Sequence, residues 1–202
     1  MLRCLRVTDG SEREESCRPA AEGAALLAGL ALVTEHVDIG NTRCYPDALA
    51  RHWQSAGAEH EGLLLLEGDK RPFPWALCEL RDCPHPWCCW AYPCYPHKTG
   101  LPAEVLAQRN VRRGETVWCR MADLARDPWC ERTGLGLVRF GPALTQHVPP
   151  IGIDTVFRST FDAEISDRCR ELLGPCHVHL PVMTHIEPGH GWPPEGPGAM
   201  AP

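Results

Sequence analysis

The sequence predicts an α+β fold: a single compact domain with a mixed or antiparallel sheet and several short helices. Two observations favour this class. Stretches with helical apolar spacing and short apolar runs typical of buried strands follow each other irregularly, without the steady strand–helix repeat of a doubly wound sheet. The chain of 202 residues is 44% hydrophobic and 23% charged, which fits one ordered domain with a substantial core.

Three regions follow from the distribution of residue types. Residues 1–18 are mostly polar and charged, and we expect a loosely ordered lead-in there. Residues 19–188 carry the periodic segments and form the globular α+β domain. Residues 189–202 are rich in Pro and Gly, which predicts a disordered or surface-draped tail.

Helices are expected where apolar residues recur at helical spacing between start and stop signals. Pro19 near a first turn predicts a helix to about His36, and Gly57 ends a second apolar stripe. Asp162 can cap the clearest helix, which Gly174 and Pro175 end. The expected helical ranges are 19–36, 46–56, 101–110, 122–126 and 162–173.

Strands are expected where short apolar or β-branched runs lie between turn signals. The run of four leucines at 63–66 is typical of a buried strand, and we expect 73–80 to pair with it across a turn. The expected strand ranges are 61–68, 73–80, 116–120, 135–140, 153–161 and 177–182. Residues 83–97 hold four prolines and predict a packed irregular loop.

The overall charge and hydropathy exclude two classes of function. A net charge of -6 argues against general nucleic-acid binding, which needs clustered positive charge. The longest apolar run, 23–33, is too short for a membrane helix, and acidic residues precede it where a secretory signal would be basic. We therefore expect an intracellular protein with reduced cysteines that binds no membrane and has a protein partner.

The 12 cysteines and 10 histidines suggest metal chemistry, and the densest thiol cluster lies in the central loop. A structural zinc site needs four tetrahedral ligands, often supplied as close pairs. Two-residue gaps separate members of this cluster, although no Cys-x2-Cys pair occurs. The candidate structural zinc ligands are Cys83, His85, Cys88, Cys94 and His97.

A second candidate metal site lies near the C-terminus. On a strand, His177 and His179 project to the same face because side chains alternate. A third ligand from His185 would leave a position open for water, with Glu187 as a base. This set predicts, as an alternative function, a metal-dependent hydrolase.

A thiol enzyme is the other alternative. Cys44 precedes an expected helix, whose unsatisfied N–H groups favour a thiolate. His85 would then be the base and Asp127 its orienting group, as in a thiol hydrolase or transferase. An ordinary cysteine beside a helix start is the competing interpretation.

The leading hypothesis is a Cys/His-rich protein with a structural zinc site that acts in interaction or regulation rather than turnover. It depends on ligand density in a proline-rich segment that cannot form regular hydrogen bonds throughout.

Overall fold

The computed structural model describes residues 1–38, 40–90, 104–111, 114, 116–147, 149–152, 154–157 and 160–180. The strands are β1 (Leu2–Thr8), β2 (Leu32–His36), β3 (Gly62–Glu67), β4 (Trp87–Trp90), β5 (Glu104–Arg109), β6 (Val117–Arg120), β7 (Trp129–Cys130), β8 (Arg132–Thr133), β9 (Leu137–Phe140) and β10 (Cys176–His179). The helices are α1 (Glu12–Glu15), α2 (Arg18–Leu27), α3 (Cys44–Ala58), α4 (Pro74–Asp82), α5 (Met121–Arg126), α6 (Pro142–Thr145) and α7 (Phe161–Leu173).

A seven-stranded mixed sheet in the order β2-β1-β3-β9-β4-β10-β7 forms the centre of the fold. Strands β2, β1 and β3 are parallel to one another, and helices connect them along the chain. Strand β9 runs antiparallel between β3 and β4, whereas β10 pairs parallel with β4. The predicted α+β class with a mixed sheet is confirmed.

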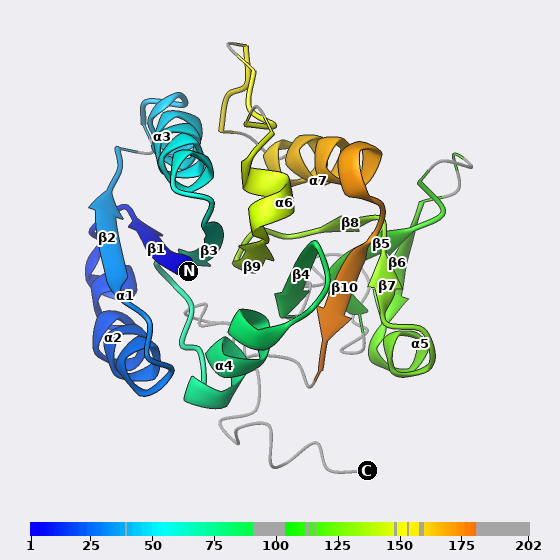
Figure 1. Ribbon diagram of the computed structural model, residues 1–202, viewed down its shortest axis with the longest axis horizontal. Helices are drawn as coiled ribbons and strands as arrows, with labels where there is room; N and C mark the ends of the chain where they lie inside the picture. Colours follow the sequence, from blue (N-terminus) through cyan, green and yellow to red (C-terminus); the bar gives the residue numbers. More distant parts are fainter. Residues whose placement is uncertain are drawn as a thin grey trace.

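Helices cover both faces of this sheet, which gives three layers (Figure 1). Helices α3, α6 and α7 lie on one face, and α2 and α4 lie on the other. We call these the α7 face and the α4 face. A smaller antiparallel sheet, β6-β5-β8, lies with α5 beyond the β7 end of the main sheet.

Strand β3 shows why the core has two halves. Leu63 and Leu65 pack in the cluster under the α7 face, whereas Leu64 and Leu66 pack in the cluster under the α4 face. Alternation along a strand sends successive side chains to opposite faces, so a run of four leucines suits a strand that is covered on both sides.

Strand β4 is equally buried, although its sequence is unusual. Trp87 and Cys89 point into the α7-face cluster, and Cys88 and Trp90 point into the α4-face cluster. The adjacent cysteines therefore lie on opposite sides of the same sheet.

Several predicted elements are correct. The expected helices at 46–56 and 162–173 correspond to α3 and α7, and that at 122–126 corresponds to α5. Gly174 follows α7 with φ +87°, a conformation that glycine adopts without strain. The expected strands at 61–68, 116–120, 135–140 and 177–182 contain β3, β6, β9 and most of β10.

The N-terminal region differs from the sequence prediction. Residues 1–18, expected to be a loose lead-in, contain strand β1, which lies between β2 and β3. Leu5 and Val7 supply its core contacts, so a few apolar residues among charges are enough for a strand. The helix expected at 19–36 ends at Leu27, and the chain then forms β2, because Gly29 turns it with φ +68°.

Three further assignments were wrong. Residues 73–80, expected to be a strand, belong to helix α4, in which Ala76, Leu77 and Leu80 form one buried stripe. The helix expected at 101–110 is replaced, from Glu104 onward, by β5. The loop expected at 83–97 contains strand β4 between its prolines.

In the strand expected at 153–161, the described residues before Phe161 carry only turns and bends. Asp162 is not the cap of α7, which begins after Thr160; its carboxylate accepts a hydrogen bond from the Leu135 N–H instead. The tail expected at 189–202 lies outside the described residues. None of the helices in the described ranges combines the length and hydrophobicity needed to span a lipid bilayer.

Candidate metal centre

Two cysteines reach the α4 face from neighbouring parts of the chain. Cys83 follows the last turn of α4, where its N–H donates to the Leu80 carbonyl. Four residues later the chain enters β4, and Cys88 projects to the same face. Both residues are buried, so their thiols lie between the helix and the sheet.

Two histidines join them from the other end of the sequence. Strand β10 pairs parallel with β4 in a register that sets His177 opposite Cys88 and His179 opposite Trp90. Residues opposite each other on adjacent strands share a face, so both imidazoles lie on the α4 face with Cys88.

The ligand atoms converge. One nitrogen of His179 and the sulfurs of Cys83 and Cys88 all lie within 4.8 Å of one another. Nδ1 of His177 and Nε2 of His179 are buried and make no hydrogen bond in the described structure. Buried polar atoms without partners are costly, and a bound cation would satisfy both nitrogens.

An acidic residue contacts the ring nitrogen of His179 that points away from the cysteines. Oε2 of Glu79 on α4 lies 3.3 Å from Nδ1 of His179. A carboxylate at this nitrogen favours the tautomer whose lone pair is on Nε2, the atom that faces the cysteines. The pair therefore has the arrangement usual for metal-bound histidines.

The electrostatics favour a thiolate at this position. The Cys88 thiol donates to Cys83 and is the main cause that lowers the pKa of Cys83 to about 2; burial opposes the shift, and the neighbouring His177 and His179 rings and the His85 backbone add to it. The same hydrogen bond raises the pKa of Cys88, which retains the shared proton. Burial opposes ionisation of His179, but Cys83 and Glu79 outweigh it and raise the pKa of its imidazole. A cation that replaced these protons would meet strong sulfur and nitrogen ligands.

Aromatic rings surround the cluster. The His85 ring centroid lies 4.3 Å from that of His177, and Trp129 contacts both rings edge-on. The Trp90 ring stacks on His179 at 5.6 Å. These contacts fix the orientation of both histidines, as a preorganised site requires. Cys83, Cys88 and His179 form the convergent group, and the His177 ring lies beside it, 4.8 Å from that of His179. We call these four residues the Cys2His2 cluster.

The structure thus brings together residues that the sequence assigned to two separate metal sites. Cys83 and Cys88 come from the expected central set, and His177 and His179 from the expected C-terminal set. His85 lies beside the cluster. Cys94, His97, His185 and Glu187 lie outside the described residues.

The residues of the thiol-enzyme alternative lie apart. Cys44 begins α3 and packs at the α7-face cluster, whereas His85 lies at the α4 face against His177. Asp127 forms an ion pair with Arg109. In the part of the chain that the structure describes, no contact joins Cys44 to His85 or Asp127.

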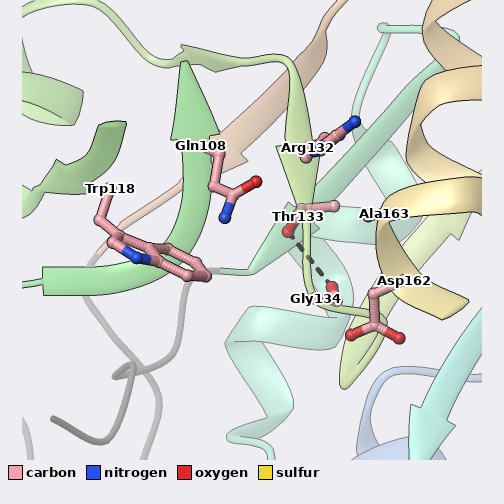
Figure 2. Close-up of a pocket in the computed structure, with 7 residues that line it drawn as sticks. All are labelled: Gln108, Trp118, Arg132, Thr133, Gly134, Asp162 and Ala163. Atoms are coloured by element: carbon pink, nitrogen blue, oxygen red, sulfur yellow. Dashed lines mark hydrogen bonds between the residues drawn. The ribbon is translucent and has the colours of Figure 1, made fainter. Parts of the chain in front are cut away.

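A small pocket of about 110 Å³ opens on the other side of the molecule, between the small sheet and the start of α7 (Figure 2). In its wall the Thr133 hydroxyl has two acceptors within reach of its single proton, the Gly134 carbonyl at 3.2 Å and the Cys89 sulfur at 3.1 Å. Burial, and then the nearby Glu67 charge, raises the pKa of Asp162 to about 7. The lining residues are Gln108, Trp118, Arg132, Thr133, Gly134, Asp162 and Ala163.

Sequence analysis missed two groups of residues with chemical potential. Glu79 lies in the range 73–80, which was expected to be a strand. Its position on a helix that packs next to His179 could therefore not be predicted. Cys130 is not among the candidate ligands named from the sequence, although its sulfur lies within 4.8 Å of those of Cys89 and Cys176. The strand register brings the three cysteines together, and the packing of α4 on the sheet brings Glu79 to His179.

No protein-family model matches the sequence, and no curated protein does either. Among solved structures, the chain is similar to one described as a glycosyltransferase involved in the glycosylation of the major capsid of PBCV-1. The two share 11% identity with a TM-score of 0.42, over 89% of this chain and 82% of the other. A likeness at this level carries no argument about function.

Proposed function

We propose that this chain is a zinc protein in which the Cys2His2 cluster holds a structural zinc ion. The observation that carries the proposal is the convergence of Cys83, Cys88 and His179, whose ligand atoms lie within 4.8 Å of one another. The buried Nδ1 of His177, which lacks a hydrogen-bond partner, lies on the ring next to His179 and is the proposed fourth ligand. Two sulfurs and two imidazoles are a ligand set that zinc commonly takes in structural sites.

The identity of the ion follows from the donor set. Hard cations such as Mg²⁺ and Ca²⁺ prefer oxygen ligands, and the cluster presents sulfur and nitrogen. With two thiolates, a divalent ion gives a site of zero net charge, which limits the cost of burying it. Zinc satisfies both conditions and undergoes no redox chemistry.

A structural role is favoured over a hydrolytic one. With His177 as the proposed fourth ligand beside the three that converge, four protein ligands would close a tetrahedral zinc shell, whereas a catalytic site needs a position for water. Cys83 and Cys88 are buried, and the His179 side chain is only 13% exposed. In this proposal the ion supports the fold, and the chain acts through interaction or regulation rather than turnover.

The ion would join distant segments. Cys83 and Cys88 lie at the end of α4 and in β4, and the two histidines lie in β10, the last described strand. Zinc bound by the cysteines and the histidines together would hold β10 in the sheet, so metal binding would contribute directly to the stability of the fold.

Metal analysis of the full chain, purified without a His tag, tests the proposal. We expect zinc in the purified protein, and loss of one equivalent in His179→Ala. His147→Ala is the matched control, because His147 is exposed and lies outside the cluster. Less than about a tenth of an equivalent of zinc, together with unchanged thermal unfolding in chelator, would overturn it.

A further inference from the structure

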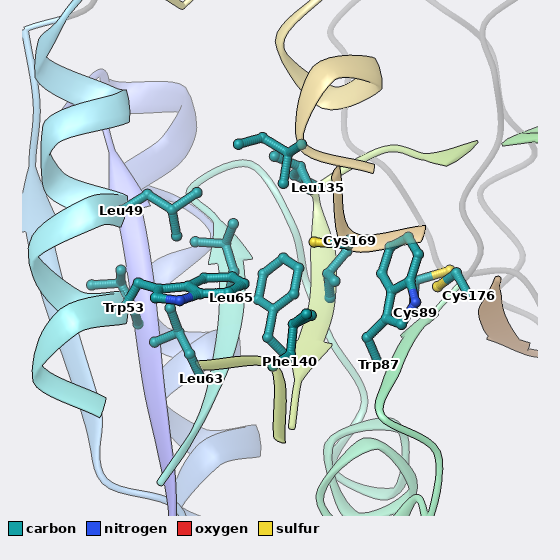
Figure 3. Close-up of a cluster of buried hydrophobic side chains, with 14 of the residues drawn as sticks. Leu49, Trp53, Leu63, Leu65, Trp87, Cys89, Leu135, Phe140, Cys169 and Cys176 are labelled. Carbon is teal, nitrogen blue, oxygen red and sulfur yellow. The ribbon is translucent and has the colours of Figure 1, made fainter. Parts of the chain in front are cut away.

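A second group of thiols lies on the opposite face of the same strands. Cys89 on β4, Cys130 on β7 and Cys176 on β10 have sulfurs that all lie within 4.8 Å of one another. Figure 3 shows the Cys89 and Cys176 side chains directed toward one another beside Trp87 in the core. Each residue is at most 1% exposed. We call these residues the three-cysteine cluster.

Strand pairing fixes the positions of the three residues. Cys176 lies opposite Cys130 in the antiparallel β10–β7 pair. Cys89 lies opposite Val178, two residues further along β10 and therefore on the same face as Cys176. The three Cα positions belong to the adjacent strands β4, β10 and β7 of one sheet, whose pairing holds them in place as a binding site requires.

Ordinary core packing explains isolated buried cysteines, such as Cys169 on α7, which packs in the same apolar cluster. It gives no reason for three thiols to meet. A disulfide would use two of them and leave the third. A soft metal ion uses all three, because thiolates are the preferred ligands of such ions.

We propose that the three-cysteine cluster is a second metal site, which binds a soft divalent ion through three thiolates. This site is independent of the Cys2His2 cluster and shares no ligand with it. Binding replaces three S–H protons by three metal–sulfur bonds, so three protons leave and the occupied site carries one net negative charge.

Charge decides between classes of soft ion. A monovalent ion with three thiolates would leave two negative charges in the core, and a divalent ion leaves one. The Thr133 hydroxyl lies 3.1 Å from the Cys89 sulfur, and by directing its single proton to the thiolate it would offset part of that charge. The divalent ion is therefore the better fit.

The same threonine provides contact with solvent. Thr133 lines the pocket between the small sheet and α7 and touches the cluster from the other side. The cluster therefore lies one side chain away from a solvent-accessible pocket. An ion can be loaded there either during folding or after a local displacement of Thr133.

Cadmium is the probe, because it is divalent and thiophilic and its ¹¹³Cd NMR shift depends on the number of sulfur ligands. The full chain, reduced and kept anaerobic, is refolded with ¹¹³Cd²⁺. We expect a resonance typical of three sulfur ligands in addition to that of the Cys2His2 cluster. The Cys130→Ala variant should lose the first resonance and one bound equivalent, and Cys169→Ala, the matched control, should lose neither.

Cys176→Val provides a second test if Cys130→Ala does not fold, because valine suits a buried strand position. Folded wild-type protein without a three-sulfur resonance would overturn the proposal. So would a Cys130→Ala variant that binds as much cadmium as the parent, or thiol counting that shows two of the three cysteines joined in a disulfide. If the wild-type spectrum shows the three-sulfur resonance but none from the Cys2His2 cluster, the result would contradict the Cys2His2 proposal and leave this one standing.

Discussion

Replacing Glu79 by Gln tests whether the carboxylate behind His179 contributes to metal binding. Glu79 Oε2 lies 3.3 Å from His179 Nδ1, so the substitution keeps an oxygen acceptor in place and removes the negative charge. The charge matters because it polarises the imidazole and makes Nε2 a stronger ligand. The zinc affinity of Glu79→Gln should therefore fall while the fold is retained.

The size of the effect follows from the exposure of the carboxylate. Loss of such an outer partner typically costs about 10- to 100-fold in metal affinity. The Glu79 side chain is 49% exposed, so solvent screens its charge and the lower end applies. We expect about a tenfold rise in the zinc Kd, which corresponds to about 1.4 kcal/mol.

The assay is competition against a chromophoric zinc chelator at fixed pH and ionic strength. Asp82→Asn is the matched control, because Asp82 ends the same helix, is 62% exposed and pairs with Arg81 rather than with the cluster. Both variants lose one negative charge from α4. An unchanged Kd in Glu79→Gln, or an equal loss in Asp82→Asn, would refute the local role of Glu79.

Three other substitutions test the fold on the α7 side of the sheet, away from the Cys2His2 cluster. Phe140→Ala should lower the free energy of unfolding by about 3–5 kcal/mol in denaturant titrations, because it empties a buried position beside Trp53, yet leave zinc content unchanged. Gly57→Ala, normally favourable in a helix, should instead cost about 1–3 kcal/mol by the same assay, because the new Cβ would overlap the Thr145 carbonyl oxygen. Burial raises the pKa of Asp162 from 3.8 to about 7, so the folded state keeps its proton where the unfolded state loses it, and stability falls as pH rises through that window. Asp162→Asn should flatten this slope in urea titrations across pH, by about 4 kcal/mol at most; an unchanged slope would contradict the assignment.

The local sequence pattern predicted the elements whose own apolar residues are enough to indicate a helix or a strand. The apolar stripe of α3 has helical spacing, and the run of four leucines in β3 is short and lies between glycines; both elements form as expected. The pattern of α4 is ambiguous because its apolar positions are few and follow a turn after β3, which favours a hairpin; Pro74 at its first turn is the helix-start signal. Strand β5 was misread because its extended form depends on pairing with β6 and β8, which no local pattern encodes.

The candidate metal centre shows the same limit in its chemistry. All four residues of the Cys2His2 cluster were recognised as potential ligands, but they were divided between two sites. Cys88 and His177 are about ninety positions apart in the sequence, and only the parallel pairing of β4 with β10 makes them neighbours. The sequence shows which residues can act as ligands, whereas which of them come together depends on the register of strands far apart in the chain.

The doublets Cys88-Cys89 and Cys176-His177 explain how two separate clusters arise from such short segments. Alternation sends the members of each doublet to opposite faces, and the β4–β10 register aligns the doublets so that each face receives a ligand from both strands. A one-residue shift of β10 would exchange the faces of Cys176 and His177, and would set a histidine among the buried thiols of the α7 face. Metal binding on either face would therefore oppose that shift, so the ligands would help to select the strand register that brings them together.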